Sequence, residues 1–184
     1  MTSFTENLEK YASLAVEIGV NIQPGQTLFI NAPISSIEFA RLVAKKAYEA
    51  GAEDVQFEWN DDELTRLKYE LAPDESFTKY PTWRAKGKEE LAEKNAAFLS
   101  IISANPDLLN GIDPLRVQDA NKAAATALAT YRKYAMSSKI SWSIVAVPNP
   151  VWAEKVFPDL PAEKQMDALW EAIFNATRVN LEQP

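Results

Sequence analysis

Short apolar segments alternate with longer segments of helical period along the whole chain. Four of them predict strands, at residues 27–31, 54–59, 97–102 and 142–147. Each connection between them is long enough to hold a helix, and a strand–helix–strand connection favours parallel neighbours. The pattern therefore predicts an α/β fold, an open, mostly parallel sheet of four to five strands with helices on both faces. This layering is Rossmann-like, but the five glycines stand apart and form no dinucleotide fingerprint.

Two of these segments differ in a way that places them within the sheet. Residues 97–102 are apolar with one exception, which is typical of a central strand that is buried on both faces. In residues 54–59, Val55, Phe57 and Trp59 alternate with polar side chains, so one face of this strand meets water. We therefore expect residues 54–59 to lie near an edge of the sheet.

The expected helices begin at recognisable capping residues. In three places a serine or asparagine precedes a glutamate by three positions, a spacing that lets each side chain bind the other residue's backbone N–H group. These predicted capping boxes are Ser3–Glu6, Ser35–Glu38 and Asn60–Glu63. A capping residue before proline marks two further helix starts, at Asp113 and Asn149. We expect the helix after Asp113 to continue to about Ala135, and the last helix to end near Arg178.

The chain contains no cysteine and no histidine. The lack of cysteine excludes disulfides, thiol nucleophiles and zinc–cysteine sites. The lack of histidine removes the commonest general base and the commonest zinc ligand. Three consecutive carboxylates, Asp61, Asp62 and Glu63, stand at a predicted helix start, where they complement the helix dipole; magnesium binding through oxygen ligands is the alternative interpretation.

Charge and hydropathy exclude two classes of partner. A net charge of -7 repels a phosphate backbone, and the basic cluster at Arg84, Lys86 and Lys88 is expected on a solvated helix face, so no nucleic acid is expected to bind. The longest uncharged stretch, residues 18–37, is broken by asparagine, proline and glycine, so no membrane association is expected. The chain also begins without the pattern of a signal peptide. We therefore expect a cytoplasmic location.

Asparagines recur where the predicted strands end. In an open parallel sheet, ligands bind outside the carboxyl ends of the strands. Two interpretations stay open for the side chains at these ends: they cap the following helices, or they face a ligand or another domain. The candidate cavity-facing or domain-facing residues are Asn31, Asn60, Asn105, Asn149 and Trp152. Core packing is the alternative role for Trp152.

Several segments in collinear order resemble one known protein family. The strongest match is formed by residues 141–142, 147–153 (Val-Pro-Asn-Pro-Val-Trp-Ala) and 156–159, although Asn149 stands where threonine is expected. The other segments are residues 11–12, 20–26, 102–109, 111–114, 169–173 and 176–179. Each is weak when taken singly, but together they extend over nearly the whole chain, and they resemble the M29 metalloaminopeptidases.

The resemblance implies a longer, two-domain cytoplasmic enzyme that removes N-terminal residues from peptides. Such an enzyme uses two divalent metal ions, of the zinc, cobalt or magnesium type, bound by Glu, His and Asp of a C-terminal domain. No catalytic residue and no metal ligand of that family is carried over to this chain. We therefore expect residues 1–178 to form an N-terminal α/β domain and residues 179–184 to begin a linker to the catalytic domain.

The resemblance also implies a role for such an N-terminal domain. It helps to enclose the substrate cavity in a homodimer and is not itself catalytic, so the 184-residue chain alone is expected to be inactive. The expected partners are the C-terminal catalytic domain, a second copy of the parent protein and peptide substrates. A stand-alone α/β module that binds a small ligand or dimerises is the alternative.

Overall fold

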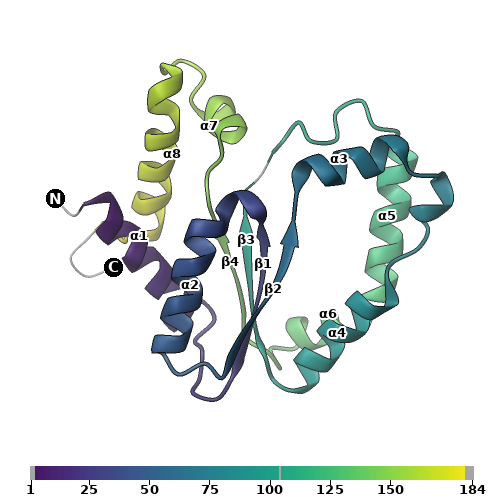
Figure 1. Cartoon of the computed structure of the whole chain (residues 1–184), viewed down its shortest axis with the longest axis horizontal. Coiled ribbons are helices and arrows are strands. Elements are labelled where there is room, and N and C mark those ends of the chain that lie inside the picture. The colour runs from purple at the N-terminus through teal and green to yellow at the C-terminus, as the bar shows by residue number, and fades with distance from the viewer. Residues whose placement is uncertain (1–2, 104, 181–184) are drawn as a thin grey trace.

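The computed structural model describes residues 3–103 and 105–180, and it is built around one open sheet (Figure 1). The four strands of the sheet are β1 (Thr27–Pro33), β2 (Asp54–Asn60), β3 (Ala97–Ile102) and β4 (Trp142–Ala146). All neighbours are parallel, in the order β2-β1-β3-β4. The predicted α/β class is confirmed, with β3 in a central position and β2 at an edge.

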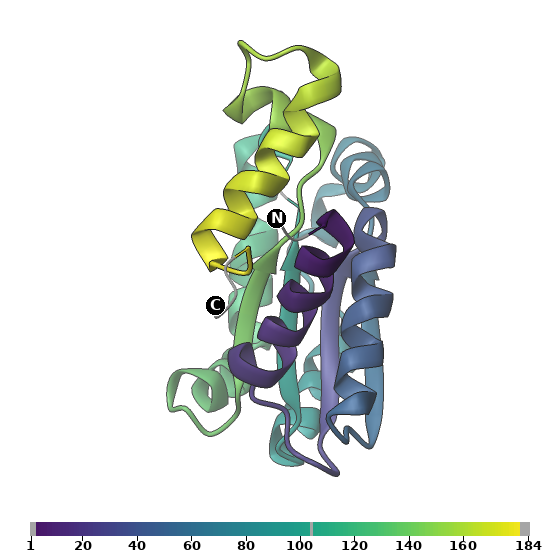
Figure 2. The same ribbon diagram turned by 90° about the vertical axis from the view of Figure 1, so that its left-hand side faces the viewer.

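One face of the sheet carries the larger core. It is covered by α1 (Phe4–Ser13), a following π-helical turn (Leu14–Gly19), α2 (Ile37–Glu49) and α8 (Ala162–Thr177), which are visible together in Figure 2. A short helix, α7 (Pro150–Val156), packs against α8. Leu28, Ile30 and Leu99 project from β1 and β3 into this core and are almost completely shielded from solvent. Burying side chains of this size contributes about 1.5–3 kcal/mol each.

The opposite face is covered only in part. The helices α4 (Thr82–Glu93) and α6 (Ala129–Met136) enclose a small second core around Phe98. Three elements, α3 (Asp62–Leu71), a 3-10 turn (Asp74–Ser76) and α5 (Pro114–Ala127), form an arm that stands away from the sheet (Figure 1). Neither α3 nor α5 has a buried residue.

Phe77 holds the arm together. Its ring is buried and stacks on Tyr69 with 5.0 Å between ring centroids. The Lys68 and Arg116 cations lie over the ring, at 5.6 and 5.4 Å from its centroid. Arg116 also pairs with Asp74 at 2.8 Å, so one arginine joins α5 to the 3-10 turn. The arm therefore has its own small cluster, separate from both cores of the sheet.

The predicted helix starts are confirmed in part. The capping box at Ser3 and Glu6 is present. The one predicted at Ser35 and Glu38 is wrong, because a 3-10 turn (Ile34–Ser36) precedes α2 and the Ser36 hydroxyl donates to the Pro33 carbonyl at 2.8 Å. The capping box predicted at Asn60 and Glu63 is also wrong.

Asp61, and not Asn60, caps α3, with its carboxylate accepting from the Leu64 N–H at 2.8 Å. The single long helix expected after Asp113 is divided at Leu128 into α5 and α6. Within residues 3–103 and 105–180, no helix combines the length and the hydropathy that a membrane span requires.

Each edge strand of the sheet receives a tyrosine hydroxyl. At the β4 edge, Tyr11 of α1 donates to the Ala146 carbonyl at 3.1 Å and accepts from the Ala146 N–H at 2.9 Å. At the β2 edge, the Tyr48 hydroxyl accepts from the Val55 N–H at 3.2 Å. Unpaired edge groups are templates for unwanted strand pairing, and these hydroxyls occupy some of them.

We predict that Tyr11→Phe lowers the free energy of unfolding by about 1–3 kcal/mol at neutral pH, because the half-buried Ala146 backbone groups lose their partner. Burial also raises the pKa of Tyr11, although its hydrogen bond to Ala146 acts in the opposite direction. A raised folded-state pKa means that the stabilising contribution is present below about pH 10 and is lost as pH rises through the folded-state value. Urea unfolding from pH 7 to 11 should therefore show a weaker alkaline loss of stability in Tyr11→Phe.

The matched control is Tyr131→Phe, since burial raises the pKa of that phenol as well. Tyr131→Phe should also weaken the loss of stability at alkaline pH, and it should leave the β4 edge intact. It should lower the free energy of unfolding at pH 7 by less than Tyr11→Phe does. An equal cost at pH 7 for the two variants would contradict a special role for the Tyr11 hydroxyl.

Candidate functional site

The carboxyl ends of the four parallel strands lie at one end of the sheet, where α3 and α7 begin (Figure 1). We call this end the rim. It includes Asn31 of β1, Asn60 at the end of β2, and Asn105 and Asn149, which follow β3 and β4. The rim therefore brings together residues that the sequence places far apart.

Two of the predicted residues hydrogen-bond to each other across neighbouring strands. The Asn60 side-chain amide donates to the Asn31 side-chain oxygen at 3.0 Å. Asn31 is half-buried and Asn60 is exposed. Because Asn60 is engaged with β1, it does not cap the helix that follows it.

Asn149 connects β4, the end of β3 and α7. Its side-chain oxygen accepts from the Trp152 N–H at 2.9 Å, which confirms the predicted cap, and its amide donates to the Ser103 hydroxyl at 3.0 Å. Trp152 is half-buried and packs against the larger core. Core packing is thus one established role of the Trp152 ring.

Asn105 stabilises the loop between β3 and α5. Its side-chain oxygen accepts from the Asp107 N–H at 3.0 Å. Arg66 of α3 reaches the same loop and donates to the carbonyls of Leu108 and Asn110 at 2.8 and 2.7 Å. A shallow hollow of about 450 Å³ lies between this loop and α3. Its lining consists of Asp62, Glu63, Arg66, Leu67, Asn105, Asp107 and Leu108.

The carboxylates at this hollow have different environments. The Lys155 ammonium of α7 lies 2.9 Å from the Asp107 carboxylate, and their hydrogen bond lowers the pKa of Asp107. Burial, with the neighbouring Asp61 charge, raises the pKa of Asp62. Among residues 3–103 and 105–180, no three Asp, Glu, His or Cys side chains converge in a way that could hold a metal ion.

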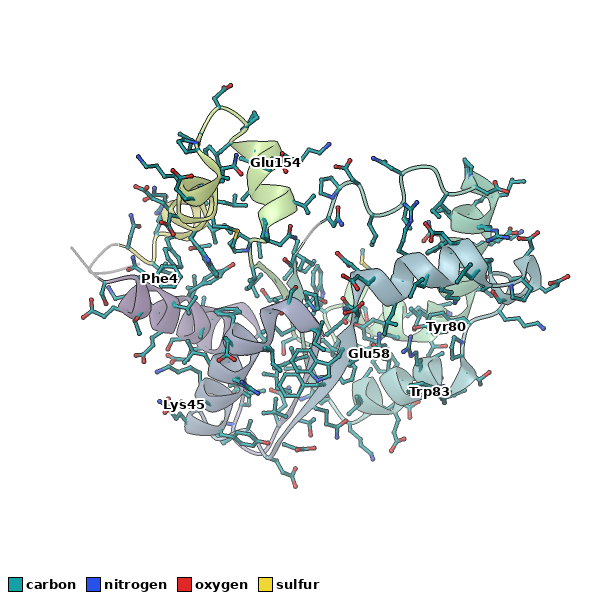
Figure 3. The ribbon with its side chains drawn as sticks, turned by 45° about the horizontal axis from the view of Figure 1, so that its top comes forward. Phe4, Lys45, Glu58, Tyr80, Trp83 and Glu154 are labelled. Atoms are coloured by element: carbon teal, nitrogen blue, oxygen red, sulfur yellow. The ribbon has the colours of Figure 1, made fainter. Side chains whose placement is uncertain are left out.

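The sequence did not reveal a second concave region, between β2 and α4. It is a groove of about 940 Å³ with Glu58 on β2 and the exposed Trp83 on α4 (Figure 3). The Glu58 carboxylate binds Lys88 at 2.6 Å and Arg84 at 3.2 Å. The expectation that this basic cluster lies on a solvated face is therefore wrong for Lys88, whose side chain is only 15% exposed. The sequence did contain one signal. Arg84 and Lys88 are four residues apart on a predicted helix, and Glu58 lies on the solvent-facing side of a predicted strand.

The rim suits binding and positioning better than proton transfer. Asn31, Asn60, Asn105 and Asn149 offer amides, which donate and accept hydrogen bonds and do not titrate. Ser103 is paired with an amide and not with a base. A hydrogen-bonding surface of this kind can hold peptide groups in place.

Comparison with known proteins gives the family. A family model described as "Thermophilic metalloprotease (M29)" matches residues 4–184. The chain is 54% identical to Aminopeptidase 2 of Geobacillus stearothermophilus and 53% identical to Aminopeptidase AmpS of Bacillus subtilis (strain 168). Both matches cover the whole chain and 45% of the relative.

A solved structure agrees with these sequence matches. Wild-type AmpT from Thermus thermophilus superposes with a TM-score of 0.88 at 39% identity, over 94% of this chain and 43% of that one. The chain thus spans less than half the length of the curated relatives that it matches. Because the family match extends over residues 4–184 and the fold agrees, the chain belongs to the thermophilic metalloprotease family M29.

Proposed function

We propose that this chain is the N-terminal, non-catalytic domain of a cytoplasmic, two-metal aminopeptidase that removes N-terminal residues from peptides. The observation that carries the proposal is the M29 match over residues 4–184, combined with coverage of only 45% of the aminopeptidase relatives. Residues 1–178 form the domain in this proposal, and residues 179–184 begin the linker. Residues 181–184 of that linker lie outside the part of the chain that the structure describes.

The metal ions of such an enzyme belong elsewhere in the polypeptide. An M29 metalloprotease implies divalent ions, which supply Lewis acidity and an activated water when bound. The described residues do not fit such a centre, since they bring together no group of three potential ligands, and the sequence contains no histidine. The zinc-, cobalt- or magnesium-type pair is therefore assigned to the catalytic domain, and no catalytic step is assigned to this chain.

The role that we propose for this domain is to enclose the substrate cavity and to support a homodimer of the parent enzyme. The amides of the rim support it, because Asn31, Asn60, Asn105 and Asn149 present donors and acceptors along one end of the sheet. Most of these amides already bond to neighbouring groups, which fixes their orientation. A wall of fixed amides can align an extended peptide without bonding strongly to any one sequence.

A stand-alone small-ligand module is the second candidate. The groove between β2 and α4 favours it, since about 940 Å³ is a volume typical of ligand pockets. Against it, the carboxylate of Glu58 is already bound by Lys88 and Arg84. A ligand would have to displace these ion pairs or bind above them.

We predict that the 184-residue chain alone hydrolyses no aminoacyl chromogenic substrate, with or without cobalt or zinc. A fusion that joins residues 1–184 to the part of Aminopeptidase 2 that the match does not cover should be active in the presence of the metal. Release of the chromophore measures both, and the intact relative serves as the positive control. Metal-dependent turnover by the chain alone would overturn the proposal, and Asp61, Asp62 and Glu63 would then become the first residues to substitute.

We also predict that the rim affects which peptides the fusion accepts. Asn149→Ala and Trp152→Ala should each change the ratio of kcat/KM between a tripeptide and a decapeptide by about tenfold, or roughly 1.4 kcal/mol of selectivity. Initial rates on the two peptides measure this ratio. Asn149→Asp keeps an oxygen for the cap of α7 and removes the amide donor, so it separates helix capping from peptide contact.

The matched controls lie away from the rim. Trp83→Ala removes an exposed tryptophan of α4, and Asn121→Ala removes an exposed asparagine of α5. Both should leave the selectivity ratio unchanged. If the two rim variants also left it unchanged, the rim would have no part in peptide selection.

A further inference from the structure

Among the residues that the structure describes, the second core covers the face of the sheet toward α4 and α6 only near the amino ends of the strands. Near the amino ends of the strands, Phe29 and Phe98 contact each other, and Leu91 of α4 and Tyr131 of α6 pack against this second core. Nearer the rim, the next row of the same face runs across all four strands in register, through Glu58, Asn31, Ser100 and Ile144. Within the part of the chain that the structure describes, neither core includes a residue of this second row.

The second row changes character from one side to the other. On β2 and β1 it is polar, with the Glu58 carboxylate bound by α4 cations and the Asn31 side chain hydrogen-bonded to Asn60. On β3 it continues as Ser100 and on β4 as Ile144, which is 54% exposed. Two more exposed apolar side chains flank it on the same face: Ile102, one row nearer the rim, is 46% exposed, and Trp142, in the row of Phe98, is 48% exposed. Trp142 is held in place by a hydrogen bond from its indole N–H to the Ala135 carbonyl of α6, at 3.3 Å. We call these three residues the β3–β4 surface.

Such a surface is unusual for an isolated parallel sheet. Parallel sheets occur almost only with both faces covered, because strand–helix–strand connections place helices on each side. Single exposed apolar side chains are common, whereas three at neighbouring positions of two adjacent strands are of the kind that marks an interaction site. Among the residues that the structure describes, no second layer buries the β3–β4 surface in the way that is usual for a parallel sheet.

We propose that the catalytic domain of the polypeptide docks on the β3–β4 surface. The inference rests on the proposed function, which makes this chain one domain of a longer enzyme. To that proposed function, the docking surface adds the face through which the two domains meet. Ile144 and Ile102 are the central contacts in this proposal, with Trp142 at the margin near α6.

Two observations favour this occupant. The relatives are more than twice as long as the matched segment, so a second domain-sized piece of chain must pack somewhere. Figure 2 shows α8 on the β4 side of the sheet; α8 packs on the face opposite to the β3–β4 surface, and the β4 edge is the nearer way round to that surface.

The absence of cysteine from the sequence provides a direct test. Ile144→Cys and Ile102→Cys each place one thiol on the β3–β4 surface. Ile18→Cys is the matched control, because Ile18 is 71% exposed and lies in the π-helical turn after α1, over the other face of the sheet. Each variant is made in the chain alone and in the fusion with the remainder of Aminopeptidase 2. Alkylation of the introduced thiol is followed by peptide mass spectrometry, and circular dichroism checks the fold.

Thiol reactivity follows solvent access, so the two surface thiols should react readily in the chain alone and about tenfold or more slowly in the fusion. The control thiol should react equally in both. Equal reactivity of the Ile144→Cys thiol in the two proteins would overturn the docking surface, as would protection that appears in the chain alone when its concentration rises. Aminopeptidase activity of the unsubstituted fusion reports separately on the proposed function, so an active fusion with a reactive surface thiol rejects only the docking surface.

Discussion

Tyr11 connects the sheet to the layer of helices packed on it, and the rest of the structure depends on this contact. Its hydroxyl binds both backbone groups of Ala146 at the β4 edge, and its ring stacks on Phe39 of α2 with 5.1 Å between centroids. One side chain of α1 therefore joins an edge strand to the helical layer. By occupying backbone groups at the β4 edge and stacking on α2, Tyr11 fixes the helical layer against the sheet and blocks one template for strand pairing.

The two faces of the sheet then differ for a physical reason. The side with α1, α2 and α8 carries the larger apolar core, whereas the side with α4 and α6 carries, among the described residues, the small second core around Phe98. The polypeptide between β2 and β3 and between β3 and β4 instead builds the arm around Phe77, which Tyr69, Lys68 and Arg116 stabilise. Residues that could have covered the sheet near the rim are used to hold the arm away from it. The exposed Ile102 and Ile144 lie on this side of the sheet, where we propose that the catalytic domain docks.

Local signals in the sequence predicted local structure correctly. The alternation of Val55, Phe57 and Trp59 identified an edge strand, and capping residues before proline identified the starts of α5 and α7. Two capping boxes failed because capping depends on register to within one residue. At β2, Asn60 binds Asn31, a residue 29 positions away, and the cap moves to Asp61. The pairing of Glu58 with Lys88 and Arg84 escaped prediction because it joins distant segments. The four-residue spacing of the cations indicates that they share a helix face, but not which strand that face meets.

The difference between local signals and long-range contacts also applies to the candidate site. Sequence placed these residues after the strands at one end of the sheet, because parallel strands bring their carboxyl ends to one place whatever their side chains are. It could not say that these side chains bond mainly to neighbouring side chains and backbone groups, as Asn149 does with Ser103 and Trp152. An amide that already has a partner contributes little net free energy to a ligand, because each new hydrogen bond replaces an existing one. Such a rim offers shape and orientation more than affinity, which is consistent with the enclosing role that we propose for it.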